Sequence, residues 1–187
     1  MKDRRFLSYL LIELCTSIYA VSINFLPLYG LILGVSVSEI MTIFGSITIV
    51  NCILGIIIGH FSDISGRKWY YVFDLAVDSI PAVIFALTNN KVIFIIAIIL
   101  TMIKDMFAPI SLAYFYDCFS DEDGTIVLGV VSSVSNILSL ILPVGVSILW
   151  AHSTRIVFLL GAGGSIMAGI IAALMLPNIK LECEKST

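Results

Sequence analysis

Five ionisable side chains stand inside long apolar stretches of the sequence, where charge is rarely found. They are Glu13, Asp74, Asp78, Lys104 and Asp105. A charged group at the centre of a membrane-spanning helix costs about 2.5–3.5 kcal/mol on insertion scales, so each of these residues needs a partner or a function. A carboxyl group in such a place can take up and release a proton, and a carboxylate beside an ammonium group can join two helices. Both chemistries are candidates for this set.

The spacing of these residues indicates which of them can meet. Asp74 and Asp78 are four residues apart and therefore share one face of a helix. At about 1.5 Å per residue, Asp78 lies roughly 13 Å along its helix, and Lys104 on the antiparallel helix that follows reaches the same level. We predict that Lys104 pairs with Asp78 or Asp74, whereas Asp105 faces a different side of its helix.

Two interpretations of these charges stay open. Asp74, Asp78 and Lys104 are candidates either for a structural ion pair or for proton coupling. Glu13 and Asp105 have no obvious partner in the sequence, which makes them the better candidates for coupling.

Uncharged polar residues in the same apolar stretches are candidates for a solute cavity. They are Asn24, Asn51, Asn136, Tyr19 and Tyr114, with Tyr116 nearby. The alternative for each Asn is a hydrogen bond that joins two neighbouring helices.

These side chains require long helices to hold them, because a bilayer-crossing segment needs about 20 mostly apolar residues with every backbone amide satisfied internally. The sequence offers six such stretches, near residues 6–33, 37–61, 69–87, 92–116, 126–150 and 156–176. We therefore predict an all-α membrane protein with a six-span bundle over residues 1–177 and a polar cytoplasmic tail over residues 178–187.

The composition excludes several other classes. Hydrophobic residues make up 59% of the chain and charged residues 12%, against about 45–50% and about 25% in soluble domains. The net charge of -3 gives no basic excess for nucleic acid. The four cysteines are far apart and no HExxH or GxSxG motif occurs, so we expect no enzyme activity, no cofactor and no metal site.

Basic residues predict the orientation, because they concentrate on the cytoplasmic side of short loops. An N-terminus inside places seven of them in the cytoplasm and only two outside. The seven are Lys2, Arg4, Arg5, Arg67, Lys68, Lys180 and Lys185, and the two are Lys91 and Arg155. Both termini are therefore predicted to be cytoplasmic.

The two halves of the chain also resemble each other. Phe25-Leu26-Pro27 matches Phe107-Ala108-Pro109 at an offset of 82 residues, and Asn51-Cys52-Ile53-Leu54 matches Asn136-Ile137-Leu138-Ser139 at an offset of 85. Because three spans form each copy, the second copy would enter the membrane from the opposite side, as in an inverted repeat.

A charged loop separates the second and third stretches: Gly59-His60-Phe61-Ser62-Asp63-Ile64-Ser65-Gly66-Arg67-Lys68. Gly66 can supply a positive φ for a tight reversal, and Gly59 can let two helices approach closely. Arg67 and Lys68 hold the reversal on the cytoplasmic side, with Asp63 within reach of a cation.

This loop resembles the signature loop of the major facilitator superfamily, G-x-x-x-D-[RK]-x-G-[RK]-[RK], with Ile64 where the family usually has a basic residue. The stretch 25–29, Phe-Leu-Pro-Leu-Tyr, is similar to the end of the family's first span. The resemblance implies a charge network of Asp63, Arg67 and Asp117 that holds one conformation and releases it during alternating access. It also implies that the first, second, fourth and fifth spans surround a cavity, while the third and sixth are peripheral.

The resemblance leads us to expect one six-helix half of a permease in the plasma membrane. Such a protein would perform secondary active transport of a small solute by alternating access, with proton coupling as one option. A full transporter of this kind has twelve spans, so a homodimer or a second six-span chain would be needed for activity. The alternative is a non-transporting membrane protein, such as an assembly partner or a sensor, or an inactive fragment of a split transporter.

Overall fold

The computed structural model describes residues 2–119 and 121–178, and this part of the chain is helical with no strand. Six of its helical segments are long and apolar enough to cross a membrane, which confirms the expected number of spans. These segments are Arg4–Ile32, Val37–Ile64, Arg67–Leu87, Lys91–Cys118, Asp123–His152 and Thr154–Met175. The individual helices are α1 (Lys2–Ile23), α2 (Leu26–Ile32), α3 (Val37–Ser65), α4 (Arg67–Val77), α5 (Ser79–Leu87), α6 (Lys91–Ile103), the 3-10 turn η1 (Lys104–Phe107), α7 (Ala108–Cys118), α8 (Asp121–His152) and α9 (Thr154–Met175).

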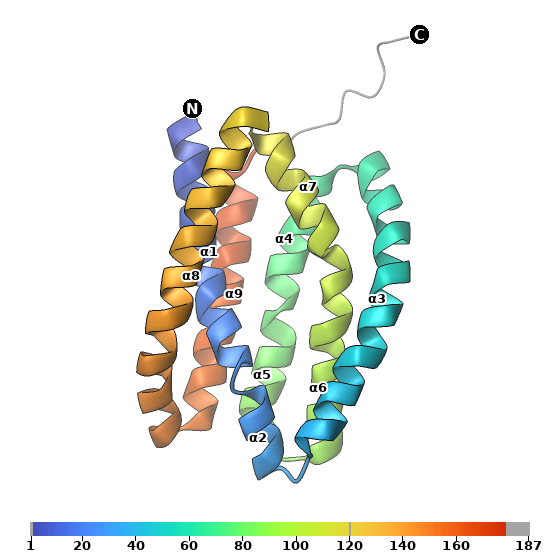
Figure 1. Ribbon diagram of the computed structural model, residues 1–187, viewed down its shortest axis with the longest axis vertical. Helices are drawn as coiled ribbons and strands as arrows, with labels where there is room; N and C mark the ends of the chain where they lie inside the picture. The colour runs from blue at the N-terminus through green and yellow to red at the C-terminus, as the bar shows by residue number, and fades with distance from the viewer. Residues whose placement is uncertain (1, 120, 179–187) are drawn as a thin grey trace.

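The six spans run up and down in alternation (Figure 1). The start of α1, the α3–α4 junction, the α7–α8 junction and the end of α9 lie at one end of the bundle, which we call the signature-loop end. The α2–α3, α5–α6 and α8–α9 junctions lie at the opposite, far end. Both ends of the described chain therefore lie on one side. The cytoplasmic location of that side, the inverted repeat and the tail over residues 178–187 stay predictions; residues 179–187 lie outside the described part of the chain.

The third and sixth spans are the centre of the bundle. In their most apolar windows, 44% and 50% of the residues are buried, against 11% and 6% in the second and fifth spans. Within this six-span unit, α9 packs along α1, α4 and α5; the expected peripheral place of the third and sixth spans concerns a complete transporter and stays a prediction.

Glycines allow the close approach of α9 to its neighbours. A Cβ at Gly164 would lie 2.5 Å from the carbonyl oxygen of Cys15 on α1, and one at Gly169 would lie 3.2 Å from Ala76 Cβ on α4. Gly163 faces open space. The small side of α9 therefore faces α1 and α4, where side chains would hold the backbones apart.

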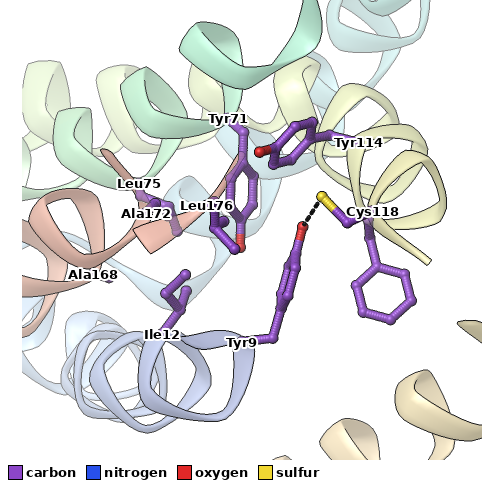
Figure 2. Packing of buried hydrophobic residues seen from close by; sticks show 10 residues of the cluster. Tyr9, Ile12, Tyr71, Leu75, Tyr114, Cys118, Ala168, Ala172 and Leu176 are labelled. Atoms are coloured by element: carbon purple, nitrogen blue, oxygen red, sulfur yellow. Dashed lines mark hydrogen bonds between the residues drawn. The ribbon is translucent and has the colours of Figure 1, made fainter. Parts of the chain in front are cut away.

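Aromatic clusters close the bundle at both ends. At the signature-loop end, the rings of Tyr9, Tyr71 and Tyr114 lie side by side, as Figure 2 shows, with Tyr9 and Tyr71 centroids 6.1 Å apart. The Tyr9 hydroxyl donates to Cys118 Sγ at 3.5 Å. At the far end, a second buried cluster includes Phe85, Phe94 and Phe158.

Three of the six spans are interrupted, and a proline follows each interruption. The first span breaks between α1 and α2 ahead of Pro27, the third breaks at Asp78 ahead of Pro81, and the fourth passes through η1 ahead of Pro109. A proline lacks the N–H that would bond one turn back, so the preceding turn loses a helical hydrogen bond. Helix α8 continues through its own proline, Pro143.

Candidate functional site

The three interrupted spans meet at one cavity, which we call the central cavity. Its volume is about 420 Å³. It is lined by Glu13, Thr16, Ser17, Tyr19, Ala20, Ile23, Asn24, Asp74, Leu75, Asp78, Thr101, Met102, Lys104, Asp105, Ser135 and Ser139. These residues come from the first, third, fourth and fifth spans, so the third span takes the place that was expected for the second.

The central cavity lies where the helices are broken. Asn24 stands in the gap between α1 and α2, Asp78 at the α4–α5 break, and Lys104 and Asp105 in the 3-10 turn. Broken helices expose backbone groups, and in a membrane such segments are tolerated only where protein or a cavity surrounds them. The location of the breaks therefore points to the same site as the charges.

Lys104 is the centre of the charged residues in this cavity. Its Nζ donates to Asp78 Oδ2 at 3.1 Å and lies 3.8 Å from Asp74 Oδ1. The predicted pairing of Lys104 with Asp78 or Asp74 is therefore confirmed. Asp74 is also held by Ser111 on α7, whose hydroxyl donates to Asp74 Oδ2 at 2.8 Å.

Asp105 and Glu13 are the more open carboxylates of the cavity. Asp105 Oδ1 lies 3.9 Å from Lys104 Nζ, and its side chain is 50% exposed. The prediction that Asp105 faces a different side is wrong, because the 3-10 turn changes the rotation per residue and brings Asp105 to the same cavity. Glu13 is half-buried and forms no ion pair within the described part of the chain.

The uncharged candidates separate into two groups. Tyr19 and Asn24 line the central cavity. Asn51 and Asn136 do not: Asn51 donates to the backbone oxygen of Met102 at 2.6 Å, joining α3 to α6, and Asn136 is exposed on α8.

Tyr114 was predicted to line a cavity and does not. It is fully buried in the aromatic cluster at the signature-loop end, and its hydroxyl donates to the backbone oxygen of Pro177 at 2.6 Å. Its neighbour Tyr116 is exposed on the other side of α7. Tyr114 therefore fastens the chain after α9 to the fourth span.

The signature loop contains a second charged group, which we call the Arg67 network. Arg67 begins α4, directly after Gly66, which has a φ of 94° as the tight reversal requires. Its Nε and Nη2 donate to Asp63 Oδ1 at 3.0 and 2.7 Å, and its Nη1 donates to both carboxylate oxygens of Asp117 at 2.9 and 2.8 Å. One guanidinium group thus joins the end of α3 to the end of α7.

The neighbouring cation has a role that the sequence did not indicate. Lys68 is 8% exposed, and its Nζ donates to the backbone oxygens of Ala173 at 2.9 Å and Leu176 at 2.8 Å. An ammonium group at this place satisfies carbonyls that a helix C-terminus leaves without partners. From the sequence, Lys68 was expected only to hold the reversal of the loop, and the structure shows that it also caps α9.

Gly59 also differs from its expectation. Nothing lies within 4 Å of a Cβ placed there. The close helix approach predicted at this residue is absent from the described part of the chain, and the corresponding close contacts lie at Gly164 and Gly169 instead.

Arg5 makes a further contact that the sequence did not indicate. Arg5 Nη1 donates to the backbone oxygen of Cys118, the last residue of α7, at 3.0 Å. Arg5 was counted only as a cytoplasmic positive charge, and its position before the first apolar stretch gave no hint of a cap on the fourth span.

Comparison with known proteins gives one family. The family model described as Major Facilitator Superfamily matches residues 6–182 of the chain. No curated protein sequence matches it.

Proposed function

Because the chain belongs to the major facilitator superfamily, we propose that it performs secondary active transport of a small solute by alternating access. The family is one of membrane transporters, and the chain is a multi-pass membrane protein whose environment is the lipid bilayer. The proposal further takes the plasma membrane as its location, with both termini on the cytoplasmic side.

The observation that carries the proposal is the central cavity. It has about 420 Å³ of space and brings four carboxyl groups and one amine together at the breaks of three spans. A charged side chain inside the bilayer costs free energy, yet the chain gathers its intramembrane charges around an open volume. A solute-binding site gives that arrangement a function that packing alone does not require.

We assign the gate to the Arg67 network. The side chains of Arg67 and Asp117 are each 18% exposed, so their contact is only partly screened by water. When the network is closed, it holds the ends of α3 and α7 together at the signature-loop end. Release of Arg67 would free these two helix ends and open the cavity on that side.

Glu13 and Asp105 are the proposed sites of proton coupling. Both line the central cavity, and neither is held as closely as Asp78, which has the 3.1 Å hydrogen bond from Lys104. A carboxyl group that changes protonation during transport must exchange protons with water, which suits the half-exposed Asp105.

We further propose that a second six-helix unit covers the second and fifth spans. These spans are the least buried, and α8 presents exposed polar residues on the face that a second unit would cover. They are Ser132, Ser133, Asn136, Ser139 and Ser147. A second copy of the chain or a further six-span segment would enclose them and complete the cavity.

The test measures access to the cavity from each side of the membrane without knowledge of the solute. Ser139→Cys is introduced on the cavity-lining part of α8, in a chain in which Cys15, Cys52 and Cys183 are serine. The buried Cys118 stays as an internal control that should not react. A membrane-impermeant maleimide is applied to right-side-out and to inside-out vesicles.

Alternating access predicts labelling of Ser139→Cys from both sides. Arg67→Gln should increase the rate from the signature-loop side, because the two helix ends are no longer joined. Labelling from one side only, unchanged by Arg67→Gln, would instead support the alternative of a non-transporting membrane protein.

A further inference from the structure

Acidic residues outnumber basic residues in the lining of the central cavity. Glu13, Asp74, Asp78 and Asp105 supply four carboxyl groups, and Lys104 is the one basic residue among the lining residues. Lys104 Nζ lies 3.1, 3.8 and 3.9 Å from the three aspartates. One positive charge cannot balance four negative ones, so ionised carboxylates leave a net negative potential in the cavity.

Hydrogen bonding in the cavity is also incomplete. The Oδ1 atoms of Asp74 and Asp78 are buried without a hydrogen-bond donor in the described part of the chain. The hydroxyl of Ser17, a residue only 4% exposed, is likewise without a partner, whereas the Tyr19 hydroxyl lies within reach of Asp78 and Thr101. A buried polar atom without a partner costs about 1–3 kcal/mol, so the two carboxylate oxygens indicate missing donors.

The rest of the cavity wall is mixed, with polar uncharged residues such as Thr16, Asn24 and Ser135 beside an apolar part. The apolar part consists of Ala20 and Ile23 on the first span, Leu75 on the third and Met102 on the fourth. A ligand that packs against this apolar part has a hydrocarbon body, and the carboxylates require that its polar end carry positive charge and N–H donors.

We propose that the central cavity binds a small organic cation with N–H donors, that is, a protonated amine with an apolar body. This proposal rests on the transport function proposed above and names its class of substrate. Such a ligand supplies both the charge and the hydrogen-bond donors that the cavity lacks, whereas an anion would add to the excess of negative charge.

The test compares four probes of similar shape on the full chain in lipid nanodiscs by isothermal titration calorimetry at neutral pH. They are 2-phenylethylamine, its N,N,N-trimethyl derivative, the neutral 2-phenylethanol and the anionic 3-phenylpropanoate. We expect the amine to bind at least about tenfold more tightly than the alcohol, since a charge-assisted hydrogen bond exceeds a neutral one by about 1.4 kcal/mol or more. The trimethyl derivative should be weaker than the amine, and 3-phenylpropanoate the weakest of the four.

Charge-removing variants connect this preference to the cavity. Glu13→Gln and Asp105→Asn avoid the tightly held Lys104–Asp78 pair, and each should reduce the preference for the amine over the alcohol by about threefold. Glu39→Gln is the matched control: Glu39 is an exposed acidic residue at the far end, outside the cavity lining, and glutamine can keep its hydrogen bond to the Ser36 backbone. Circular dichroism and size-exclusion chromatography establish that each variant is folded.

The proposal is overturned if the alcohol or 3-phenylpropanoate binds as tightly as the amine, or if the folded chain does not bind the amine. Equal binding of the amine and its trimethyl derivative would contradict the need for N–H donors. An amine preference unchanged in Glu13→Gln and Asp105→Asn would place binding outside the cavity, including in the lipid. Two-sided labelling of Ser139→Cys without an amine preference would contradict only this inference, and one-sided labelling with the preference intact would contradict only the transport function.

Discussion

The Arg67 network allows a quantitative prediction, because one guanidinium group contacts two carboxylates in different environments. Asp63 is one turn before Arg67, and its side chain is 52% exposed, whereas Asp117 lies 50 residues away and its side chain is 18% exposed. An exposed pair four residues apart contributes about 0.3–0.5 kcal/mol to stability. The part-buried pair with two charge-assisted hydrogen bonds should contribute about 1.5–3 kcal/mol.

The prediction is that the coupling energy of Arg67 with Asp117 is at least about three times its coupling energy with Asp63. Two double-mutant cycles measure it, both with Arg67→Gln, one with Asp117→Asn and the other with Asp63→Asn. Free energies of unfolding come from the loss of helical circular dichroism as sodium dodecyl sulfate is added to the chain in dodecyl maltoside micelles. Each cycle subtracts the effects of its single substitutions, so the pairwise energy remains.

The two cycles share Arg67→Gln, and each therefore serves as the control for the other. Equal couplings, or a larger one for Asp63, would show that the contact between α3 and α7 is not what the Arg67 network stabilises. In that case the proposed gate at the signature-loop end would have no energetic basis.

Two further predictions concern the packing and capping of α9. Gly164→Ala should destabilise the chain by about 1–3 kcal/mol relative to Gly163→Ala. The added Cβ at residue 164 would lie 2.5 Å from the Cys15 backbone oxygen, which is 0.9 Å closer than the 3.4 Å at which ordinary contact begins. A Cβ at residue 163 would meet nothing within 4 Å. Both substitutions raise helix propensity equally, so the difference in unfolding free energy isolates the contact with α1, and equal stabilities would mean that α9 does not pack as closely as described. Lys68→Met should lower the free energy of unfolding by about 1–3 kcal/mol, since it leaves the carbonyls of Ala173 and Leu176 without their donor. Lys68→Arg keeps the charge and the donors, so it should recover most of this loss in the same unfolding measurement. If Lys68→Met does not lower the stability, Lys68 does not cap α9.

The spans and the main ion pair could be predicted from the sequence because each depends on regular helix geometry. A long apolar run between polar breaks specifies a span, since hydrocarbon leaves backbone groups no other partner. The constant rise of a helix likewise placed Lys104 at the level of Asp78, and their 3.1 Å contact followed. Asp105 was misplaced for the same reason: the prediction assumed a regular helix where the chain forms a 3-10 turn.

The interruptions were not predicted, although Pro27, Pro81 and Pro109 mark them. Pro143 shows why the residue type is insufficient, since α8 continues through it. Ile23, Asp105 and Ser139, each four residues before a proline, all line the central cavity, so a neighbouring cavity does not by itself explain why α8 stays continuous.

The direction in which each helical side chain points was the other feature that the sequence could not predict. Tyr114 and Tyr19 are both tyrosines in apolar spans, yet Tyr114 packs in the aromatic cluster and Tyr19 lines the cavity. The hydrogen-bond partners of Lys68 could not be predicted either, because its two carbonyl acceptors lie 105 and 108 residues away in the sequence. Neither assignment can be made before the helices are placed against one another.

The cap at Lys68 has a consequence for biosynthesis. The ammonium group enters the bilayer region with the third span, but its partners Ala173 and Leu176 lie at the end of the sixth span, which is synthesised later. Until the sixth span is made, the Lys68 ammonium group lacks the two carbonyls that hold it in the folded chain. Synthesis of the sixth span therefore also completes the contacts of the third span.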